Sequence, residues 1–251
     1  MKVSIITVCL NSDQTIESAL DSVLSQTHKD IEYIVIDGSS TDNTMNILRK
    51  YECQITRIVS EPDNGIYDAM NKGIKIATGE IIGILNADDY YPHKRVIEEV
   101  AATISRTNSD SCYADVLYVQ RNNLDKVVRY WKSGRFSKRK FKMGWMPHHG
   151  TFYVKRQVFE KYGVYRDRFP VAADYELMLR FLYKYGISTV YIPDVLLKIR
   201  TGGASKPGLL TTPKMMVENY RAWKVNGLNT SALTFILKPL RKIAQYIKNP
   251  G

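Results

Sequence analysis

The chain has 251 residues, enough for one large α/β domain with a short appendage at roughly 150 residues per domain. Hydrophobic residues make up 44% and charged residues 24%, which are globular proportions and exclude disordered and fibrous proteins. The net charge of +11, from 36 Lys and Arg against 25 Asp and Glu, favours anionic partners: phosphates, nucleic acid or an acidic membrane surface.

Strands and helices alternate regularly in the first third of the chain. The strands are β-branched runs typical of a buried parallel sheet, and the helices have apolar residues at helical spacing. We expect strands at Val3–Cys9, Ile31–Ile36, Ile55–Val59 and Glu80–Leu85, with helices at Thr15–Gln26, Thr41–Tyr51 and Gly65–Ala77. These βα units predict a doubly wound, Rossmann-like, mainly parallel sheet in an α/β fold.

The rhythm changes after residue 89. We expect helices at Val96–Ser105, Phe159–Tyr162, Asp174–Tyr185 and Thr212–Val225, and strands at Cys112–Gln120, Lys126–Trp131, Thr151–Val154, Ser188–Ile192 and Val195–Ile199. The predicted organisation is therefore one domain over residues 1–205, with halves 1–89 and 90–205, followed by a basic, amphipathic helical extension over residues 206–251.

Cys9, Cys53 and Cys112 are scattered, without a Cys-x-x-Cys pair, which argues against a zinc knuckle or a disulfide scaffold and suits a reducing compartment. The apolar run after Lys2 is shorter than the about 20 residues that a membrane span needs, and no signal-peptide cleavage site follows it. We expect a cytoplasmic protein, peripheral at the inner face of the membrane if its basic segments contact lipid.

Acidic residues follow three of the predicted strands: Asp37 after the second, Asp63 after the third, and Asp88 with Asp89 after the fourth. Because the carboxyl ends of parallel strands meet at one sheet edge, we expect these carboxylates to converge there. Crowded like charges are costly unless a cation or hydrogen-bond donors compensate them. Oxygen ligands suit Mg²⁺ or Mn²⁺, so the pattern predicts a divalent metal at this edge.

Glycine-rich phosphate-binding loops are absent. Residues 9–14 (CLNSDQ) contain no Gly, and neither G-x-G-x-x-G nor G-x-x-x-x-G-K-S/T occurs. A dinucleotide site is disfavoured, and a P-loop is excluded. A nucleotidyltransferase acting on sugar phosphates, the second enzyme class considered, would need a glycine-rich opening loop.

Four segments agree in order and spacing with a known family: VSIITVCLNS, IVIDGSSTDNT, SEPDNGIYDAMNKGIKIATGE and IIGILNADD, across residues 3–89. A weaker match continues through Pro147–Arg156 and Asp174–Arg180. Together they resemble the family 2 glycosyltransferases of GT-A fold, including bacterial enzymes that build cell-surface polysaccharides. The resemblance implies a nucleotide-sugar donor, a Mn²⁺ or Mg²⁺ cofactor and inverting transfer, with a nucleotide-binding half (1–89) and an acceptor half (90–205).

The resemblance also assigns individual residues. It implies that the nucleotide is contacted by Thr7, Asp37, Asp68, Lys72 and Asp88, the last through the ribose. It implies that Asp89 binds the metal. Asn86 stands where a longer acidic motif has Asp. The other reading is that these acids only cap helices or form turns.

Inverting transfer needs a carboxylate base that takes the proton of the acceptor hydroxyl. Asp174 is the candidate, because it resembles the family's base at the start of an amphipathic helix, and Glu176 is the reserve. Arg180 could orient either carboxylate or bind phosphate. The alternative is that Asp174 is a first-turn acid favoured by the helix dipole.

Two histidines and a tryptophan that precede the strand expected at 151–154 are further candidate residues. His149 resembles a family position near the diphosphate and acceptor, whereas His148 fits a packed or exposed residue. In an extended backbone the two adjacent side chains would face opposite ways. Trp145 could stack on an acceptor sugar or pack in the core.

Two basic segments, Arg129–Lys142 and Asn219–Gly251, contain no acid. The first fits contact with a lipid-linked acceptor or anionic lipid, a solvated loop and, last, nucleic acid. The second fits an interfacial helix, a helix packed on the domain or a dimer contact.

The leading prediction is a metal-dependent inverting glycosyltransferase of hexosyltransferase type that moves a sugar from a nucleotide-diphosphate sugar, with UDP preferred, to a hydroxyl of a growing, lipid-linked surface glycan. The alternatives are the nucleotidyltransferase and a basic, non-enzymatic nucleic-acid-binding module.

Overall fold

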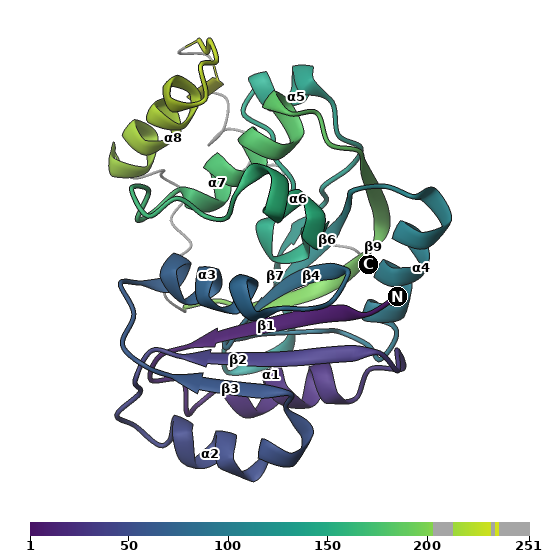
Figure 1. Ribbon diagram of the computed structural model, residues 1–251, viewed down its shortest axis with the longest axis vertical. Helices are drawn as coiled ribbons and strands as arrows, with labels where there is room; N and C mark the ends of the chain where they lie inside the picture. Colours follow the sequence, from purple (N-terminus) through teal and green to yellow (C-terminus); the bar gives the residue numbers. More distant parts are fainter. Residues whose placement is uncertain (203–212, 232–233, 236–251) are drawn as a thin grey trace.

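The computed structural model describes residues 1–202, 213–231 and 234–235 (Figure 1). Within them, nine strands form one sheet in the order β3-β2-β1-β4-β8-β6-β9-β5, with β7 paired to β6. The strands are β1 (Val3–Cys9), β2 (Ile31–Asp37), β3 (Arg57–Ser60), β4 (Ile81–Asn86), β5 (Asp89–Tyr90), β6 (Ser111–Gln120), β7 (Asn123–Trp131), β8 (Tyr153–Lys155) and β9 (Thr189–Arg200). The α/β prediction is confirmed, and the first four strands to be predicted pair in parallel.

Helices cover both faces of this sheet. The helical segments are α1 (Ile16–Leu24), α2 (Thr44–Lys50), η1 (Glu52–Gln54), α3 (Ile66–Ile76), α4 (Val96–Thr107), α5 (Lys138–Lys142), η2 (His149–Thr151), α6 (Arg156–Tyr162), α7 (Ala173–Met178), the π-helical η3 (Leu179–Lys184) and α8 (Pro213–Val225). No helix among the described residues is both long enough and apolar enough to cross a bilayer.

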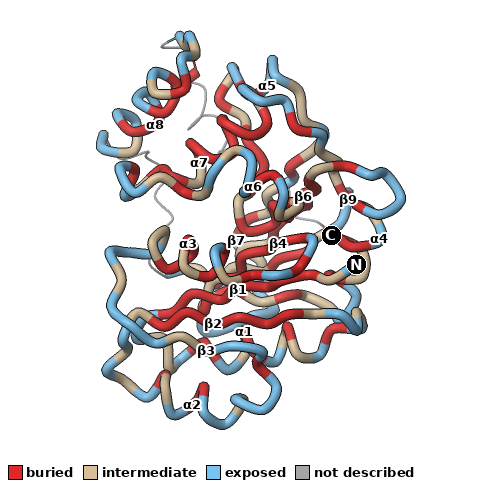
Figure 2. The backbone as a smooth tube through the Cα atoms, viewed as in Figure 1, coloured by how far each residue is buried: buried red, intermediate tan, exposed pale blue. Residues whose placement is uncertain are grey.

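Strand β1 lies at the centre of the parallel part and is buried along its whole length (Figure 2). Alternate side chains enter different cores: Ile6 packs with α3, α7 and α8 side chains such as Met70 and Trp223, whereas Ile5 packs with the α1 and α4 side chains Leu20 and Val100. Burial on both faces explains why the run is continuously apolar rather than alternating.

The second half differs in detail from the sequence prediction. The two strands expected around Pro193 are one strand, β9, because a register shift opposite Tyr113 and Asp115 accommodates the proline, which has no N–H to donate. The single helix expected from Asp174 changes to π-helical geometry at Leu179. Much of the expected basic, amphipathic extension over residues 206–251 lies outside the described residues, and the division into 1–205 and 206–251 stays a prediction.

A buried carboxylate ties together the amino ends of three neighbouring strands. Glu32, at the start of β2, accepts hydrogen bonds from Lys2, from Ser4 Oγ of β1 and from both the N–H and Oγ1 of Thr78, which precedes β4. Burial alone raises the pKa of this group, but these hydrogen bonds outweigh burial and lower the pKa from its usual 4.5 to about 2. The charged form of Glu32 therefore stabilises the fold.

We predict that Glu32→Gln lowers the free energy of unfolding at pH 7 by about 1–3 kcal/mol, since it replaces a charge-assisted acceptor of several donors. The contribution of a carboxylate with a lowered pKa is present above about 4.5 and is lost as the pH falls toward about 2. Between about pH 5 and pH 3, the free energy of unfolding should therefore fall less in the variant than in the wild type, because only the wild type loses part of the Glu32 contribution over this range. Urea unfolding at both pH values measures this, with exposed Glu52→Gln as the control. An equal pH dependence in wild type and Glu32→Gln would contradict it.

Candidate glycosyl-donor site

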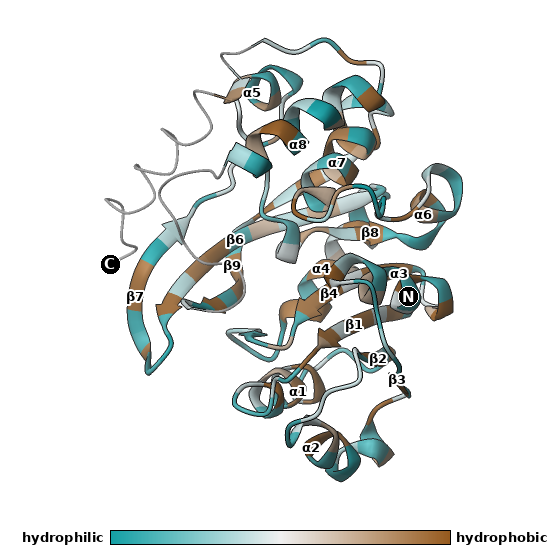
Figure 3. Cartoon of the chain, turned by 90° about the vertical axis from the view of Figure 1, so that its left-hand side faces the viewer, coloured by the Kyte–Doolittle hydropathy of each residue, from teal (hydrophilic) through white to brown (hydrophobic). Residues whose placement is uncertain are grey.

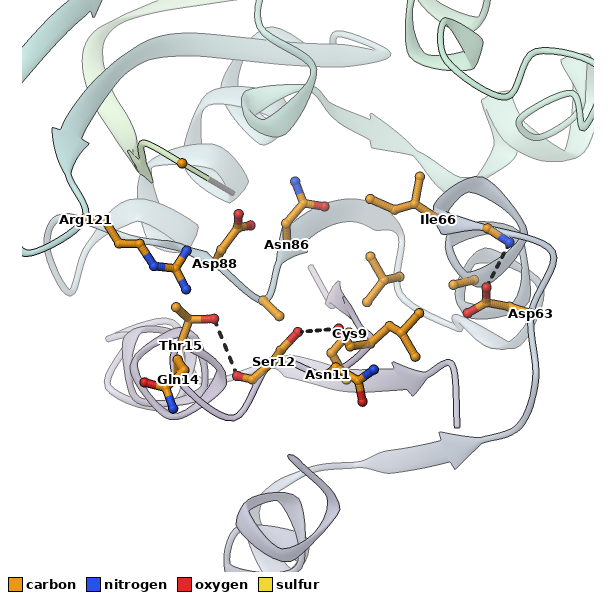
Figure 4. A pocket seen from close by; sticks show the side chains of 16 residues that line it. Cys9, Asn11, Ser12, Gln14, Thr15, Asp63, Ile66, Asn86, Asp88 and Arg121 are labelled. Atoms are coloured by element: carbon orange, nitrogen blue, oxygen red, sulfur yellow. Dashed lines mark hydrogen bonds between the residues drawn. The ribbon is translucent and has the colours of Figure 1, made fainter. Parts of the chain in front are cut away.

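A cavity of about 500 Å³ opens at the carboxyl ends of β1 and β4 (Figure 4). Its walls come from the segment after β1, the start of α1, the β3–α3 loop with the first turn of α3, the segment after β4, and the β6–β7 turn. This is the edge at which open parallel sheets bind ligands. The volume is that of a site for a nucleotide-sized ligand, which spans roughly 300–1,000 Å³.

Asn86 and Asp88 point into this cavity from the end of β4 (Figure 4). Burial raises the pKa of Asp88, while the positive charges of Arg121 and Arg200 oppose the rise. Asp88 thus offers an oxygen ligand at the rim with cationic groups beside it.

Asp89, the expected metal ligand, is 3% exposed and does not line the cavity in this structure. Residues 87 and 88 form a turn after β4, and the Asp89 carboxylate contacts the Asn86 amide. Burial, together with the charge of Asp88, raises the pKa of Asp89 well above its usual value. Asp88 thus lines the cavity, whereas Asp89 is buried against Asn86, and metal binding by Asp89 stays a prediction.

The oxygens at this point fit a hard divalent cation. Asn86 Oδ1 and Asp89 Oδ1 are buried without a hydrogen-bond partner among the described residues, although Asn86 Nδ2 donates to the other oxygen of Asp89 at 3.2 Å. Buried oxygens of this kind are normally satisfied. Asn86 and the two aspartates Asp88 and Asp89 offer the oxygen donors that Mg²⁺ and Mn²⁺ prefer.

Thr7 and Asp37, the residues expected to contact the nucleotide, are fully buried and do not line the cavity. Thr7 Oγ1 lies 3.0 Å from Tyr33 Oη, and Cys9, two residues on, lines the cavity. The Asp37 carboxylate is also fully buried and accepts the N–H of Ser40 at 3.0 Å and the hydroxyl of Ser60 at 2.6 Å. Neutral donors compensate Asp37, rather than a cation.

Asp68 and Lys72 lie one turn apart on α3, outside the cavity wall. Asp68 accepts the N–H of Asn64 at 3.0 Å, and Lys72 pairs with Glu61 at 3.0 Å and donates to the carbonyl of Pro62 at 2.6 Å. The hydrogen bond and charge of Glu61 raise the pKa of Lys72. Both residues therefore shape the β3–α3 loop, whose Asp63 and Gly65 do line the cavity.

Asp174 and His149 come together beyond α3. The Asp174 carboxylate lies 4.0 Å from His149 Nε2, and both side chains are partly exposed. Tyr67 Oη donates to Asp174 Oδ1 at 3.3 Å and to the carbonyl of Val171 at 3.2 Å. Asp174 also accepts the N–H of Tyr175, so the helix-terminus reading holds alongside the catalytic one.

Glu176 and Arg180 contact each other within the helical layer, and the phosphate binding expected of Arg180 stays a prediction. Both are buried; Arg180 forms an ion pair with Glu176 at 3.1 Å and also donates to the carbonyls of Tyr162, Gly163 and Val164. No N–H of Arg180 is directed to the cavity, because all of its neighbours lie in the helical layer. Glu176, paired on two sides by Arg180 and Arg166, is likewise no reserve base.

Trp145 is held by packing: its Nε1 donates to the carbonyl of Ser133 at 2.7 Å and its ring packs against Tyr113 and Phe136. The structure shows these packing contacts of Trp145, and its stacking on an acceptor sugar stays a prediction. His148 is buried, accepts the N–H of Gly150 through Nδ1, and has its pKa lowered by burial and then by the charges of its neighbours.

The two histidines do not face opposite ways as expected. Their rings stack with centroids 4.7 Å apart, because His149 begins the helical turn η2 instead of continuing an extended chain. His149 is therefore placed toward Asp174 by a stacked, neutral neighbour.

Sequence reasoning missed two arginines. Arg121, in the β6–β7 turn, reaches the cavity wall near Asp88 (Figure 4). Arg200, at the end of β9, donates to the backbone carbonyl of Asp88 at 2.8 Å and to Ser18 Oγ of α1 at 2.7 Å. No local sequence pattern marks either arginine as a site residue, because the position of each depends on strands that pair with partners distant in the sequence.

Comparisons with known proteins agree with this geometry. The model of glycosyl transferase family 2 matches residues 4–163. The chain is 32% identical over 193 residues to a PGL/p-HBAD biosynthesis glycosyltransferase of Mycobacterium bovis, covering 75% of this chain and 73% of that protein. It is 30% identical over 229 residues to an uncharacterized glycosyltransferase of Rickettsia typhi, covering 88% and 69%.

The fold is similar to that of two solved glycosyltransferases. S. aureus TarS, in complex with UDP-GlcNAc, superposes with a TM-score of 0.71 at 18% identity, over 94% of this chain and 69% of that one. The mannosyltransferase PcManGT of Pyrobaculum calidifontis, in complex with GDP-Man and Mn²⁺, gives a TM-score of 0.66 at 18% identity, over 95% and 68%. With the family match extending over more than half of its length, the chain belongs to glycosyltransferase family 2 and has the GT-A fold.

Proposed function

We propose that this glycosyltransferase transfers a sugar, with inversion and with the help of a divalent metal, from a UDP-sugar to a hydroxyl of a growing, lipid-linked surface glycan. The observation that carries the proposal is the cavity edge at which Asp88 and Asn86 present oxygens beside Arg121. TarS and PcManGT, which bind UDP-GlcNAc and GDP-Man, support a nucleotide-sugar donor. This assignment replaces the nucleotidyltransferase and nucleic-acid-binding alternatives.

Asp88 and Asn86 would hold the cation, which stabilises the negative charge of the departing diphosphate. Arg121 lies on the same wall and can donate two parallel hydrogen bonds to phosphate oxygens. Arg200 fixes the backbone of Asp88 and so keeps the carboxylate at the rim. Together these residues bind and orient the donor without a glycine-rich loop.

Asp174 accepts the proton of the acceptor hydroxyl as that oxygen attacks the anomeric carbon and the bond from this carbon to the diphosphate breaks. Tyr67 orients Asp174, and it does so from α3, the helix whose first turn lines the donor cavity. The base is therefore positioned by the same element that forms the donor wall.

We predict that Asp88→Asn reduces Mn²⁺-dependent UDP release at least about 100-fold, because it removes the charged oxygen that faces the diphosphate. Asp89→Asn is the matched comparison: Asp89 is 3% exposed and does not line the cavity, so we expect its substitution to have the smaller effect. Asp89→Asn should therefore keep most of the activity. The measurement is UDP release over a panel of UDP-sugars, and the reverse ranking of the two variants would restore Asp89 as the ligand.

We expect Asp174→Asn to leave UDP binding unchanged while sugar transfer falls about 100–10,000-fold, the usual range for loss of a general base. The amide keeps the size of the side chain but has no acceptor of comparable basicity. Calorimetric titration with UDP and Mn²⁺, beside a transfer assay, separates the two effects. A variant that transfers at the wild-type rate would remove Asp174 from the mechanism.

We predict that Tyr67→Phe lowers kcat about 5-fold with little change in the donor KM, since one orienting hydrogen bond contributes about 1 kcal/mol. Tyr51→Phe is the matched control, because Tyr51 also donates to carboxylates, those of Asp21 and Glu17, but lies away from the cavity. Equal kcat values for Tyr67→Phe and the control would show that the contact has no positioning role.

A further inference from the structure

One end of the molecule carries basic residues that the donor site does not use. Helices α5 and α8 lie at this end in both views (Figures 1 and 3). Tyr183 lies between them: Lys138 Nζ of α5 is 5.6 Å from the centre of its ring, and the ring packs edge-on against Trp223 of α8 at 5.0 Å. Thr234 also donates to the carbonyl of Lys142 at 2.6 Å. The two helices therefore form one surface, here called the basic end.

The exposed charges of the basic end are all positive within the described residues. No acid occurs between residues 126 and 159, and the single acid of α8, Glu218, is buried with its carboxylate accepting the N–H groups of Val171 and Ala172. The exposed cationic side chains are Lys132, Arg135, Lys138, Arg139, Lys140 and Lys142 around α5, and Lys214, Arg221 and Lys224 on α8. A surface of one sign attracts an extended anionic partner.

Helix α8 also exposes large apolar side chains among these charges. Met216, Val217 and Tyr220 are 40%, 58% and 46% exposed, while Ala222 and Trp223 on the opposite side are fully buried. A solvated helix face would not need such residues. Apolar side chains flanked by Lys and Arg on one helix face are the pattern of a helix that lies in a membrane interface.

Nucleic acid fits this surface less well. Binding of single strands uses exposed aromatic platforms on which bases stack. The aromatic residues of the α5 segment are turned inward instead: Phe141 is fully buried, and Phe136 and Trp145 pack against each other. This leaves the charges without stacking partners.

We propose that the basic end docks on a membrane of anionic phospholipid, with Met216, Val217 and Tyr220 inserted among the headgroups and the lysines and arginines around α5 contacting lipid phosphates. Charge complementarity together with the apolar face of α8 identifies this partner. The inference goes beyond sugar transfer, since none of these residues lines the donor cavity.

The test is co-sedimentation of the full chain with vesicles. The wild type should bind vesicles of equimolar phosphatidylcholine and phosphatidylglycerol, should not bind phosphatidylcholine alone, and should be released by salt. The triple variant Lys138→Glu, Arg139→Glu, Lys140→Glu should bind about 10-fold more weakly or worse. The control triple Lys29→Glu, Lys50→Glu, Arg57→Glu makes the same change in net charge at exposed sites elsewhere and should bind as the wild type does.

A second pair of changes tests insertion. Met216→Gln with Val217→Asn removes exposed apolar groups without altering charge, and we expect it to weaken vesicle binding several-fold while UDP release from the donor stays at the wild-type rate. That preserved rate separates this proposal from the catalytic one. Equal loss of binding in the two charge-reversal triples, binding to neutral vesicles, or binding of single-stranded RNA in preference to anionic vesicles would each overturn it.

Discussion

The register of β1 between its two parallel neighbours decides where the polar groups of the site lie. Cys9 at the end of β1 pairs with Asp37 of β2, and Val8 pairs with Asn86 of β4, so the three strands end at the same level. Because β1 is buried on both faces, a slip of one residue would place every side chain in the wrong core. The apolar pattern of one strand therefore fixes the floor of the donor cavity.

Carboxylates do gather at this edge, but the protein compensates each one differently. Asp37 is surrounded by the hydroxyl and amide donors of the serine loop that follows it. Asp89 is buried, and burial together with the charge of Asp88 raises its pKa. Only for Asp88, among these three, do a cavity position and nearby arginine charges leave an oxygen directed at ligand space. Hydrogen-bond donors and burial thus compensate Asp37 and Asp89, whereas the Asp88 carboxylate lines the cavity.

The second half of the chain contributes by joining distant elements. Arg200 connects the end of β9 to the backbone of Asp88 and to α1. Tyr67 connects α3 to Asp174, and the buried Glu176–Arg180 pair holds the helix on which Asp174 lies. The cavity wall and Asp174 are therefore linked through α3, so a change at either end of this contact is expected to affect the geometry of the other.

The sequence alone determined the βα alternation and the sheet edge that carries the cavity, because strand period, helix spacing and motif order are local properties. It could not show that Asp174 lies beside His149, or that Asp88 lines the cavity while Asp89 is buried, since both depend on how distant parts of the chain pack. Nor could it show that Arg180 is buried in an ion pair while Arg121 lines the cavity. The sequence does not show which group an arginine contacts. Strand pairing and helix packing between distant parts of the chain determined the contacts of Arg121, Arg180 and Arg200.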